Sequence, residues 1–103
     1  MGLKAEITLK EGKKMRAVIT VIGYDRVGLI AGISAVLAES NVNILDISQT
    51  TMQDLFTMMM LVDLDGLNID FSELKDRLEN KGKELGVDVR IQREEIFKSM
   101  HRI

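Results

Sequence analysis

The spacing of the hydrophobic positions changes along the chain, and each change marks a different structural element. Positions 16–22 are rich in β-branched residues and are followed by Gly23, which predicts a strand that ends in a turn. Apolar side chains then recur at helical spacing over positions 29–39, and Asn41 is available to end the helix. The first part of the chain therefore predicts a strand followed by a helix.

The middle of the chain returns to an extended pattern. Positions 43–52 and 56–64 are two runs suited to strands, and the polar pair Gln53-Asp54 separates them. A break this short between two strands predicts a hairpin.

The last third predicts a second helix, a final strand and a tail. Asp70 and Glu73 have the spacing of a capping box, in which Asp70 caps the helix and Glu73 reaches back to its start. Gly86 is a stop signal, positions 87–91 alternate as a strand, and residues 95–103 form a short amphipathic tail. One apolar stripe of the helix consists of Phe71, Leu74, Leu78 and Leu85.

The resulting order of elements is βαββαβ, the split-βαβ or ferredoxin-like arrangement of an α+β protein. Right-handed crossovers place its strands in the order 4-1-3-2 in one antiparallel sheet, with both helices on one face. We therefore predict a two-layer sandwich with a short C-terminal helix.

The two central strands of this sheet are apolar on both faces, although helices cover only one. A large apolar face left in water usually marks an interface or a bound ligand, so we predict a homo-oligomer, most simply a dimer. The residues predicted to face away from the helices are Val18 and Ile22 of the first strand and Leu55, Met59 and Leu61 of the third.

Composition narrows the possible functions. The 103 residues, 46% of them hydrophobic, suffice for one core, and the net charge of −2 leaves no broad cationic surface for nucleic acid or an anionic membrane. The chain has no cysteine and no apolar run of the roughly 20 residues that cross a bilayer. We therefore expect a cytoplasmic protein without disulfides or thiolate chemistry.

The chain divides into three parts. Residues 15–94 contain all the predicted elements of the sandwich, and residues 95–103 form the tail. Residues 1–14 form an N-terminal extension with weak alternation, which is compatible with an extra strand, a flexible arm or an extended start.

The turn between the first strand and the first helix is the strongest candidate for a ligand site. A helix N-terminus presents unpaired N–H groups and the positive end of the helix dipole, which suit a carboxylate or another small anion. Gly28 lies at this point and leaves room for one.

This turn also carries a family resemblance. Positions 25–30, the helix at 31–39 and the run Asn41-Val42-Asn43-Ile44 together resemble the signature of ACT domains. Positions 46–50 and 56–58 resemble a small family of stand-alone ACT proteins, which is similar to the ACT halves of glycine-cleavage-system repressors. The resemblance covers most of the chain, from Met15 onward, and several linked segments carry it.

The resemblance implies a regulatory module that binds an amino acid or a related anion at a homodimer interface, without an enzymatic activity or a cofactor. In ACT domains the glycine backbone before the first helix and an Asn near the second strand commonly bind the ligand. Val27 stands where the family often has proline, a departure that loosens the loop. Carried over to this sequence, the ligand-binding residues are Asp25, Arg26, Val27, Gly28, Leu29, Ile30 and Asn43.

Structural roles compete with these assignments. Asp25 is placed to cap the first helix, and Asn43 could merely shape the turn into its strand. The triplet Met58-Met59-Met60 fits packing better than metal binding, because alternate side chains of a strand point to opposite faces. His101 has neither a cysteine nor a close pair of carboxylates with which to form a metal site.

Three other functions are compatible with the same topology. An RNA-binding domain would need aromatic and basic residues on the first and third strands, and this sequence has none at the relevant positions. A small acyl phosphatase would use an Arg and an Asn, for which Arg26 and Asn43 are the candidates, but no glycine-rich cradle surrounds Arg26. The third is an interaction module that dimerises without a ligand.

The two edge strands differ in charge. The second strand, over positions 43–52, has Asp46 as its only charge and no Lys or Pro to block pairing, whereas the fourth carries Asp88, Arg90 and Arg93. We therefore expect two subunits to meet near the second strand and the first helix, with Gly28 and Asn43 close to the boundary.

Overall fold

A computed structural model describes residues 15–24 and 27–100 of the chain, with side chains as far as residue 97. The predicted N-terminal extension, the end of the tail including His101, and Asp25 and Arg26 lie outside these residues. The described elements are β1 (Arg16–Tyr24), α2 (Leu29–Glu39), β2 (Asn43–Met52), β3 (Leu55–Asp63), α3 (Phe71–Leu85), β4 (Asp88–Arg93) and α4 (Glu94–Met100).

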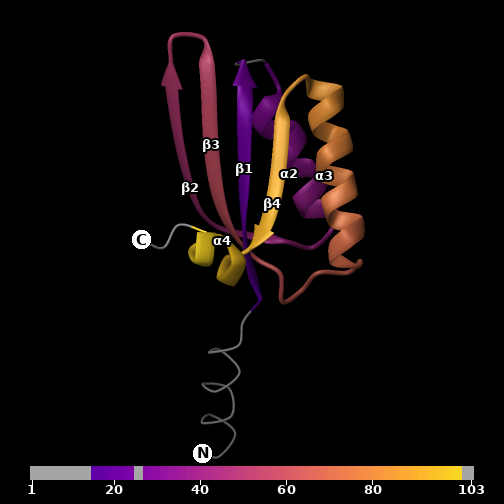
Figure 1. The fold of residues 1–103 in the computed structure, drawn as a ribbon. Helices are drawn as coiled ribbons and strands as arrows, with labels where there is room; N and C mark the ends of the chain where they lie inside the picture. The colour runs from indigo at the N-terminus through magenta and orange to yellow at the C-terminus, as the bar shows by residue number, and fades with distance from the viewer. Residues whose placement is uncertain (1–14, 25–26, 101–103) are drawn as a thin grey trace, which may run out of the picture.

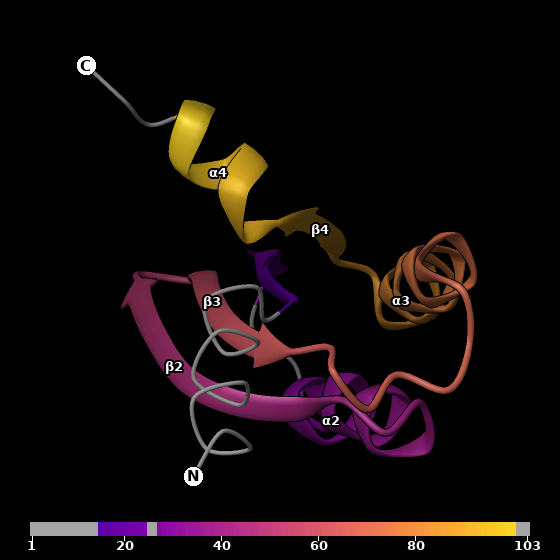
Figure 2. The same ribbon diagram turned by 90° about the horizontal axis from the view of Figure 1, so that it is seen from below.

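The strands form one antiparallel sheet in the order β2-β3-β1-β4, which is the predicted order read from the other edge (Figure 1). β1 therefore lies between β3 and β4, while β2 and β4 are the two edges. Figure 2 shows α2 and α3 on one side of the sheet and α4 on the other. The prediction of a ferredoxin-like sandwich with a short C-terminal helix is confirmed.

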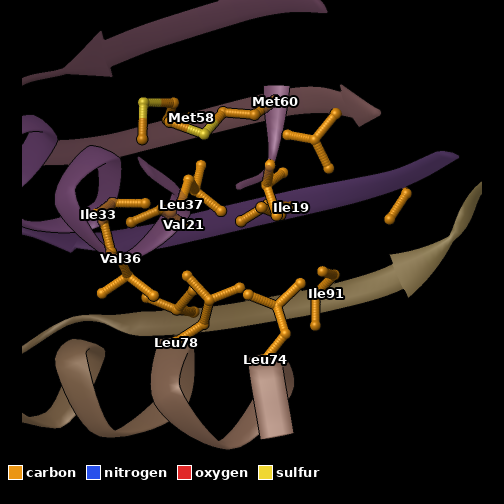
Figure 3. Close-up of a cluster of buried hydrophobic side chains, with 14 of the residues drawn as sticks. Ile19, Val21, Ile33, Val36, Leu37, Met58, Met60, Leu74, Leu78 and Ile91 are labelled. Carbon is orange, nitrogen blue, oxygen red and sulfur yellow. The ribbon is translucent and has the colours of Figure 1, made fainter. Parts of the chain in front are cut away.

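The core lies between the sheet and the two long helices. Ala17, Ile19 and Val21 of β1 are fully buried, because alternate side chains of the central strand point into this layer. Figure 3 shows Leu74 and Leu78 of α3 among core side chains from α2 and from the strands. The apolar stripe predicted for the second helix is thus confirmed as its buried face.

The triplet Met58-Met59-Met60 divides between the two faces of the sheet, as predicted. Met58 and Met60 are fully buried in the core, whereas Met59 on the opposite face is 37% exposed. The three thioethers therefore do not form one cluster.

The face of the sheet opposite α2 and α3 is only partly open. α4 packs against β1 and β4, and Arg16 at the start of β1 forms two hydrogen bonds of 3.0 Å with the carboxylate of Glu94. Val18 is buried, whereas Ile22 and Met59 remain 42% and 37% exposed. The predicted apolar second face is therefore present, and its exposed part lies toward the β2–β3 hairpin.

The predicted capping box is wrong in its hydrogen bonds. Asp70 is the N-cap of α3, but its side chain makes no capping hydrogen bond. Glu73 instead accepts a hydrogen bond from Arg77, one turn further along the helix, at 2.7 Å. The stop signal at Gly86 is correct, since this residue ends α3 in the left-handed conformation with φ of 77°.

Gly82 lets α3 approach β4 closely. A Cβ atom built on Gly82 would lie 2.8 Å from Cγ2 of Val89 and 2.9 Å from the carbonyl oxygen of Val87. These distances leave no room for a methyl group, and one of the two neighbours is backbone. The helix and the edge strand are therefore in direct contact at this residue.

We expect Gly82→Ala to lower the free energy of unfolding by about 1–2 kcal/mol, because an overpacking cost of about 2–3 kcal/mol against Val87 and Val89 exceeds the gain of about 1 kcal/mol in helix propensity. Gly32→Ala in α2 is the matched control, since its Cβ would meet at 3.0 Å only the flexible end of Leu85. The free energy of unfolding of Gly32→Ala should be unchanged or slightly higher than that of the wild type. Urea denaturation measures both, and a stabilised Gly82→Ala would show that α3 does not approach β4 this closely.

Candidate functional site

The junction of β1 and α2 presents a helix N-terminus with no side-chain cap. Gly28 is the N-cap residue, in the left-handed conformation with φ of 84°, and no side chain of the described residues caps it. The carbonyl of Gly28 accepts the first helical hydrogen bond, from the N–H of Gly32 at 2.8 Å. The N–H groups that precede Gly32 in the helix therefore lack an acceptor within α2 and can donate to a ligand.

The space around Gly28 is open. A Cβ built on this residue would have nothing within 4 Å among the described residues, and the neighbouring Val27 is fully exposed. Leu29 is only 2% exposed, so its side chain belongs to the core and only its backbone can face a ligand. Ile30 is 41% exposed. Among residues 15–24 and 27–100, the junction thus offers donors and apolar surface but no enclosing wall.

Asn43 lies at the opposite end of the sheet from this junction. It pairs with Asp63 of β3, which in turn pairs with Arg16 at the start of β1. The junction follows Tyr24 at the far end of β1, which is eight residues or about 26 Å from Arg16. One chain therefore does not bring Asn43 and Gly28 together. Figure 1 shows that β2 begins at the end of the sheet opposite to the one where β1 leads to α2.

Asp25 and Arg26 of the predicted ligand-binding set lie outside the described residues. The residues on either side of them, Tyr24 and Val27, are at the Gly28 end of the sheet. An acyl phosphatase site would need Arg26 and Asn43 to share one substrate. The distance between the two ends of the sheet gives this alternative no support.

The face of the sheet opposite α2 and α3 offers little to RNA. Tyr24 is the aromatic residue that β1 and β3 contribute to it, at the very end of β1. The centre of this face consists of small polar and aliphatic side chains, which cannot stack on bases. These residues are Val18, Thr20, Ile22, Thr57, Met59 and Leu61.

β2 is exposed over almost its whole length. Only Ile44 is partly buried, and Leu45, Ile47 and Met52 are 44%, 42% and 70% exposed. Its position at the edge is as predicted, and a bulge at Leu45 interrupts its pairing with β3. A long edge strand with one charge is a template for pairing with another strand.

Sequence reasoning missed an apolar cluster beside the candidate loop. Tyr24 of β1 pairs with Leu55 of β3, which pairs with Met52 of β2, and all three side chains are exposed. The signal was present, because these residues continue the alternation that places Ile22 and Met59 on the same face.

Two hollows of the surface lie away from Gly28 and Asn43. One of about 330 Å³ lies between α3 and β4, and another of about 170 Å³ lies on the sheet beside Asp46 and Ser48. Neither is lined by Val27, Gly28 or Asn43. The described part of the chain contains no group of His, Cys, Asp and Glu able to hold a metal ion, and none of its helices is long and apolar enough to cross a membrane.

Comparison with known proteins identifies what the chain resembles. The model of the ACT domain matches residues 15–92. A UPF0237 protein of Methanocaldococcus jannaschii is 61% identical over 88 residues, which cover 85% of this chain and 98% of that protein. The solved ACT domain protein from Streptococcus pneumoniae is 44% identical, with a TM-score of 0.71 over 82% of this chain and 94% of that one. A glycine cleavage system transcriptional repressor shares the fold at 22% identity and a TM-score of 0.68, over 78% of this chain and 46% of that one.

The left-handed backbone of Gly28 generates a stability prediction. Gly28→Ala should lower the free energy of unfolding by about 1 kcal/mol, because a Cβ is unfavourable at φ of 84° even where space is open. Gly28→Asn is the matched control, and its free energy of unfolding should fall by less, since asparagine tolerates this conformation. Chemical denaturation of both variants provides the measurement, and equal stability of wild type and Gly28→Ala would contradict the left-handed conformation.

Proposed function

The chain belongs to the ACT domain family of regulatory, ligand-binding modules, and from this membership we propose that it is a cytoplasmic, non-catalytic sensor of a free amino acid. The observation that carries the proposal is the N-terminus of α2 at Gly28, which no side chain of the described residues caps. Its free N–H groups and the helix dipole suit the α-carboxylate that all amino acids share. The exposed side chains of Val27 and Ile30 offer apolar contact to the rest of the ligand.

An amino acid also carries an ammonium group, which needs hydrogen-bond acceptors. We assign Asp25, Arg26 and Asn43 to the same site on the family resemblance. The Asn43 side chain is exposed at the start of β2, so its amide oxygen is free to accept from an ammonium group. Since Gly28 and Asn43 lie at opposite ends of one sheet, the proposed site requires two subunits.

Pairing of β2 with the β2 of a second copy supplies this arrangement. When a strand pairs with its own copy about a two-fold axis, the two strands run antiparallel. The start of β2 in one subunit then lies beside the end of β2 in the other. Asn43 of the partner subunit then lies toward the sheet end where Met52 and the β1–α2 junction are found. The free edge and the exposed apolar residues of β2 support such a dimer. We therefore propose a homodimer in which each subunit completes the site of the other.

A module that dimerises without a ligand is the second candidate. The observation in its favour is that Gly28 lines neither of the two described hollows. The two candidates differ in a measurable way, since only a sensor is stabilised by a free amino acid.

The first test is a thermal-shift screen of the wild-type chain against the amino acids, followed by two variants of Gly28. A ligand at 100 times its Kd should add about 2.7 kcal/mol to the free energy of unfolding. Gly28→Asp should abolish this gain, because its carboxylate repels that of the ligand. The asparagine of Gly28→Asn has nearly the same shape as aspartate but no charge, so this variant should retain most of the gain in stability that the ligand gives.

Two results would contradict the proposal. If no amino acid stabilises the wild type, the ligand-free interaction module is the better description. If Gly28→Asp and Gly28→Asn bind an amino acid equally well, the ligand does not place its carboxylate at α2.

The second test concerns the β2 edge. The exposed N–H of Ile47 donates to Oδ1 of Asp46 at 2.9 Å, from which we infer that the N–H of Gln49, two residues on, also points to the free edge. Gln49→Pro should then remove two symmetric hydrogen bonds of about 1 kcal/mol each and raise the Kd of the dimer about 30-fold. Sedimentation at micromolar concentrations measures the change.

Ser48→Pro is the control for this experiment. Adjacent residues of a strand send their N–H groups to opposite sides, so this proline should break a bond to β3 and destabilise the monomer itself. A monomeric wild type, or a Gln49→Pro variant that dimerises normally, would rule out the β2 interface.

A further inference from the structure

The edge of the sheet opposite β2 carries a groove that the proposed sensor function does not use. β4 pairs with β1 on one side, and among the described residues no strand pairs with its other side. α3 runs beside this edge in both views (Figures 1 and 2). Between them lies a hollow of about 330 Å³, lined on one side by residues 87–92 and on the other by Lys75, Glu79 and Lys83.

The helix is fixed against the strand at both ends of the groove. At one end Gly82 lets α3 contact Val87 and Val89 directly, and the N–H of Val87 donates to the carbonyl of Gly82 at 2.8 Å. At the other end the guanidinium of Arg93 lies 4.6 Å from the ring centroid of Phe71. The wall of the groove is therefore preformed, which lowers the entropic cost of binding.

The free edge determines what kind of ligand the groove can hold. Alternate residues of an edge strand direct backbone N–H and C=O groups away from the sheet, and these groups need partners. The six residues that line the groove span about 20 Å, which is the length of a six-residue extended chain. We propose that this groove binds an extended peptide segment of another protein, which adds to β4 as a fifth strand.

The charges of α3 determine the sequence of that peptide. Lys75, Glu79 and Lys83 are four residues apart, so they lie on one face of the helix. Among the described residues none of the three forms an ion pair. Three neighbouring cations do, in the pairs Arg77–Glu73, Lys81–Glu84 and Arg90–Asp88. The groove therefore contains two lysines and one glutamate available to a ligand.

The spacing of Lys75, Glu79 and Lys83 along α3 matches the spacing of alternate residues in an extended peptide. Lys75 and Lys83 are about 12 Å apart along the helix, with Glu79 midway. Side chains on one face of a strand recur every second residue, so positions two and four residues apart are separated by about 6.6 Å and 13 Å. The complementary peptide has an acidic, a basic and an acidic residue at alternate positions.

Two labelled peptides test this pattern by fluorescence polarisation with the full chain. The first, capped at both ends, has the order glutamate, threonine, lysine, threonine, glutamate, threonine. The second exchanges the glutamates and the lysine and so reverses each charge. Two or three surface ion pairs of about 0.5 kcal/mol each should give the first peptide about a tenfold lower Kd. Equal affinities, or no binding of either peptide, would refute the proposal.

Paired variants of α3 locate the binding. Lys75→Ala combined with Lys83→Ala should raise the Kd of the first peptide about fivefold, whereas Arg77→Ala combined with Lys81→Ala removes the same charge outside the groove and should leave it nearly unchanged. The exchange Lys75→Glu, Glu79→Lys and Lys83→Glu should reverse the preference between the two peptides. If both double variants weaken binding equally, the attraction is to the net charge of the helix and not to the groove.

Backbone methylation separates strand addition from charge attraction. N-methylation of every second residue blocks one edge of the peptide, and methylation of the intervening residues blocks the other. Of these two methylated forms, one should lose binding and the other should bind like the parent. If both bind like the parent, or if the peptide dissociates a dimer built on β4, the groove is not a site for a peptide of another protein.

Discussion

The central position of β1 is the constraint on which the rest of the molecule depends. This strand pairs with β3 on one side and β4 on the other, and its side chains Ala17, Ile19 and Val21 are fully buried beneath the helices. Because both of its neighbours come from later in the chain, the sheet closes only when segments distant in sequence meet. This order leaves β2 and β4 as edges, and it places the junction at Gly28 at one end of the sheet and Asn43 at the other.

The two edges have different chemistry, and this difference separates their proposed partners. β2 is long and almost uncharged, which suits pairing with an identical strand. β4 is shorter, carries Asp88 and Arg90, and lies beside a charged helix. Charge on an edge discourages indiscriminate pairing, but it favours a partner with the complementary pattern. Both interactions can occur together, because β3 and β1 lie between the two edges.

The helices and strands and their order along the chain could be predicted, because each element depends on the pattern of apolar and polar residues within its own segment. Alternation predicted which side chains of β1 and β3 face the core, and helical spacing predicted Leu74 and Leu78 as core residues. The hydrogen bonds of single side chains could not be predicted in the same way. Glu73 fits a capping box by spacing, yet Arg77 lies one helical turn further along and forms an ion pair with it.

The candidate site was harder to predict because its parts depend on tertiary structure. The left-handed conformation at Gly28 is consistent with the sequence, but the distance from Gly28 to Asn43 follows only from the register of three strands. Lys75, Glu79 and Lys83 have the periodicity of an ordinary solvated face. Only the contact of α3 with β4 at Gly82, a glycine without any distinctive motif, makes this face one side of a groove.

One residue connects the proposed ligand site with the proposed peptide groove. Val87 lines the groove beside β4, and a Cβ on Gly23 would lie only 2.7 Å from its Cγ1 atom. Gly23 is the last residue but one of β1, immediately before the segment that leads to Gly28. A peptide that displaced Val87 would therefore press on the end of β1 that precedes the proposed ligand site. Any effect of this kind is reciprocal, so an amino acid bound at the proposed site would change the affinity of the groove for the peptide by the same factor.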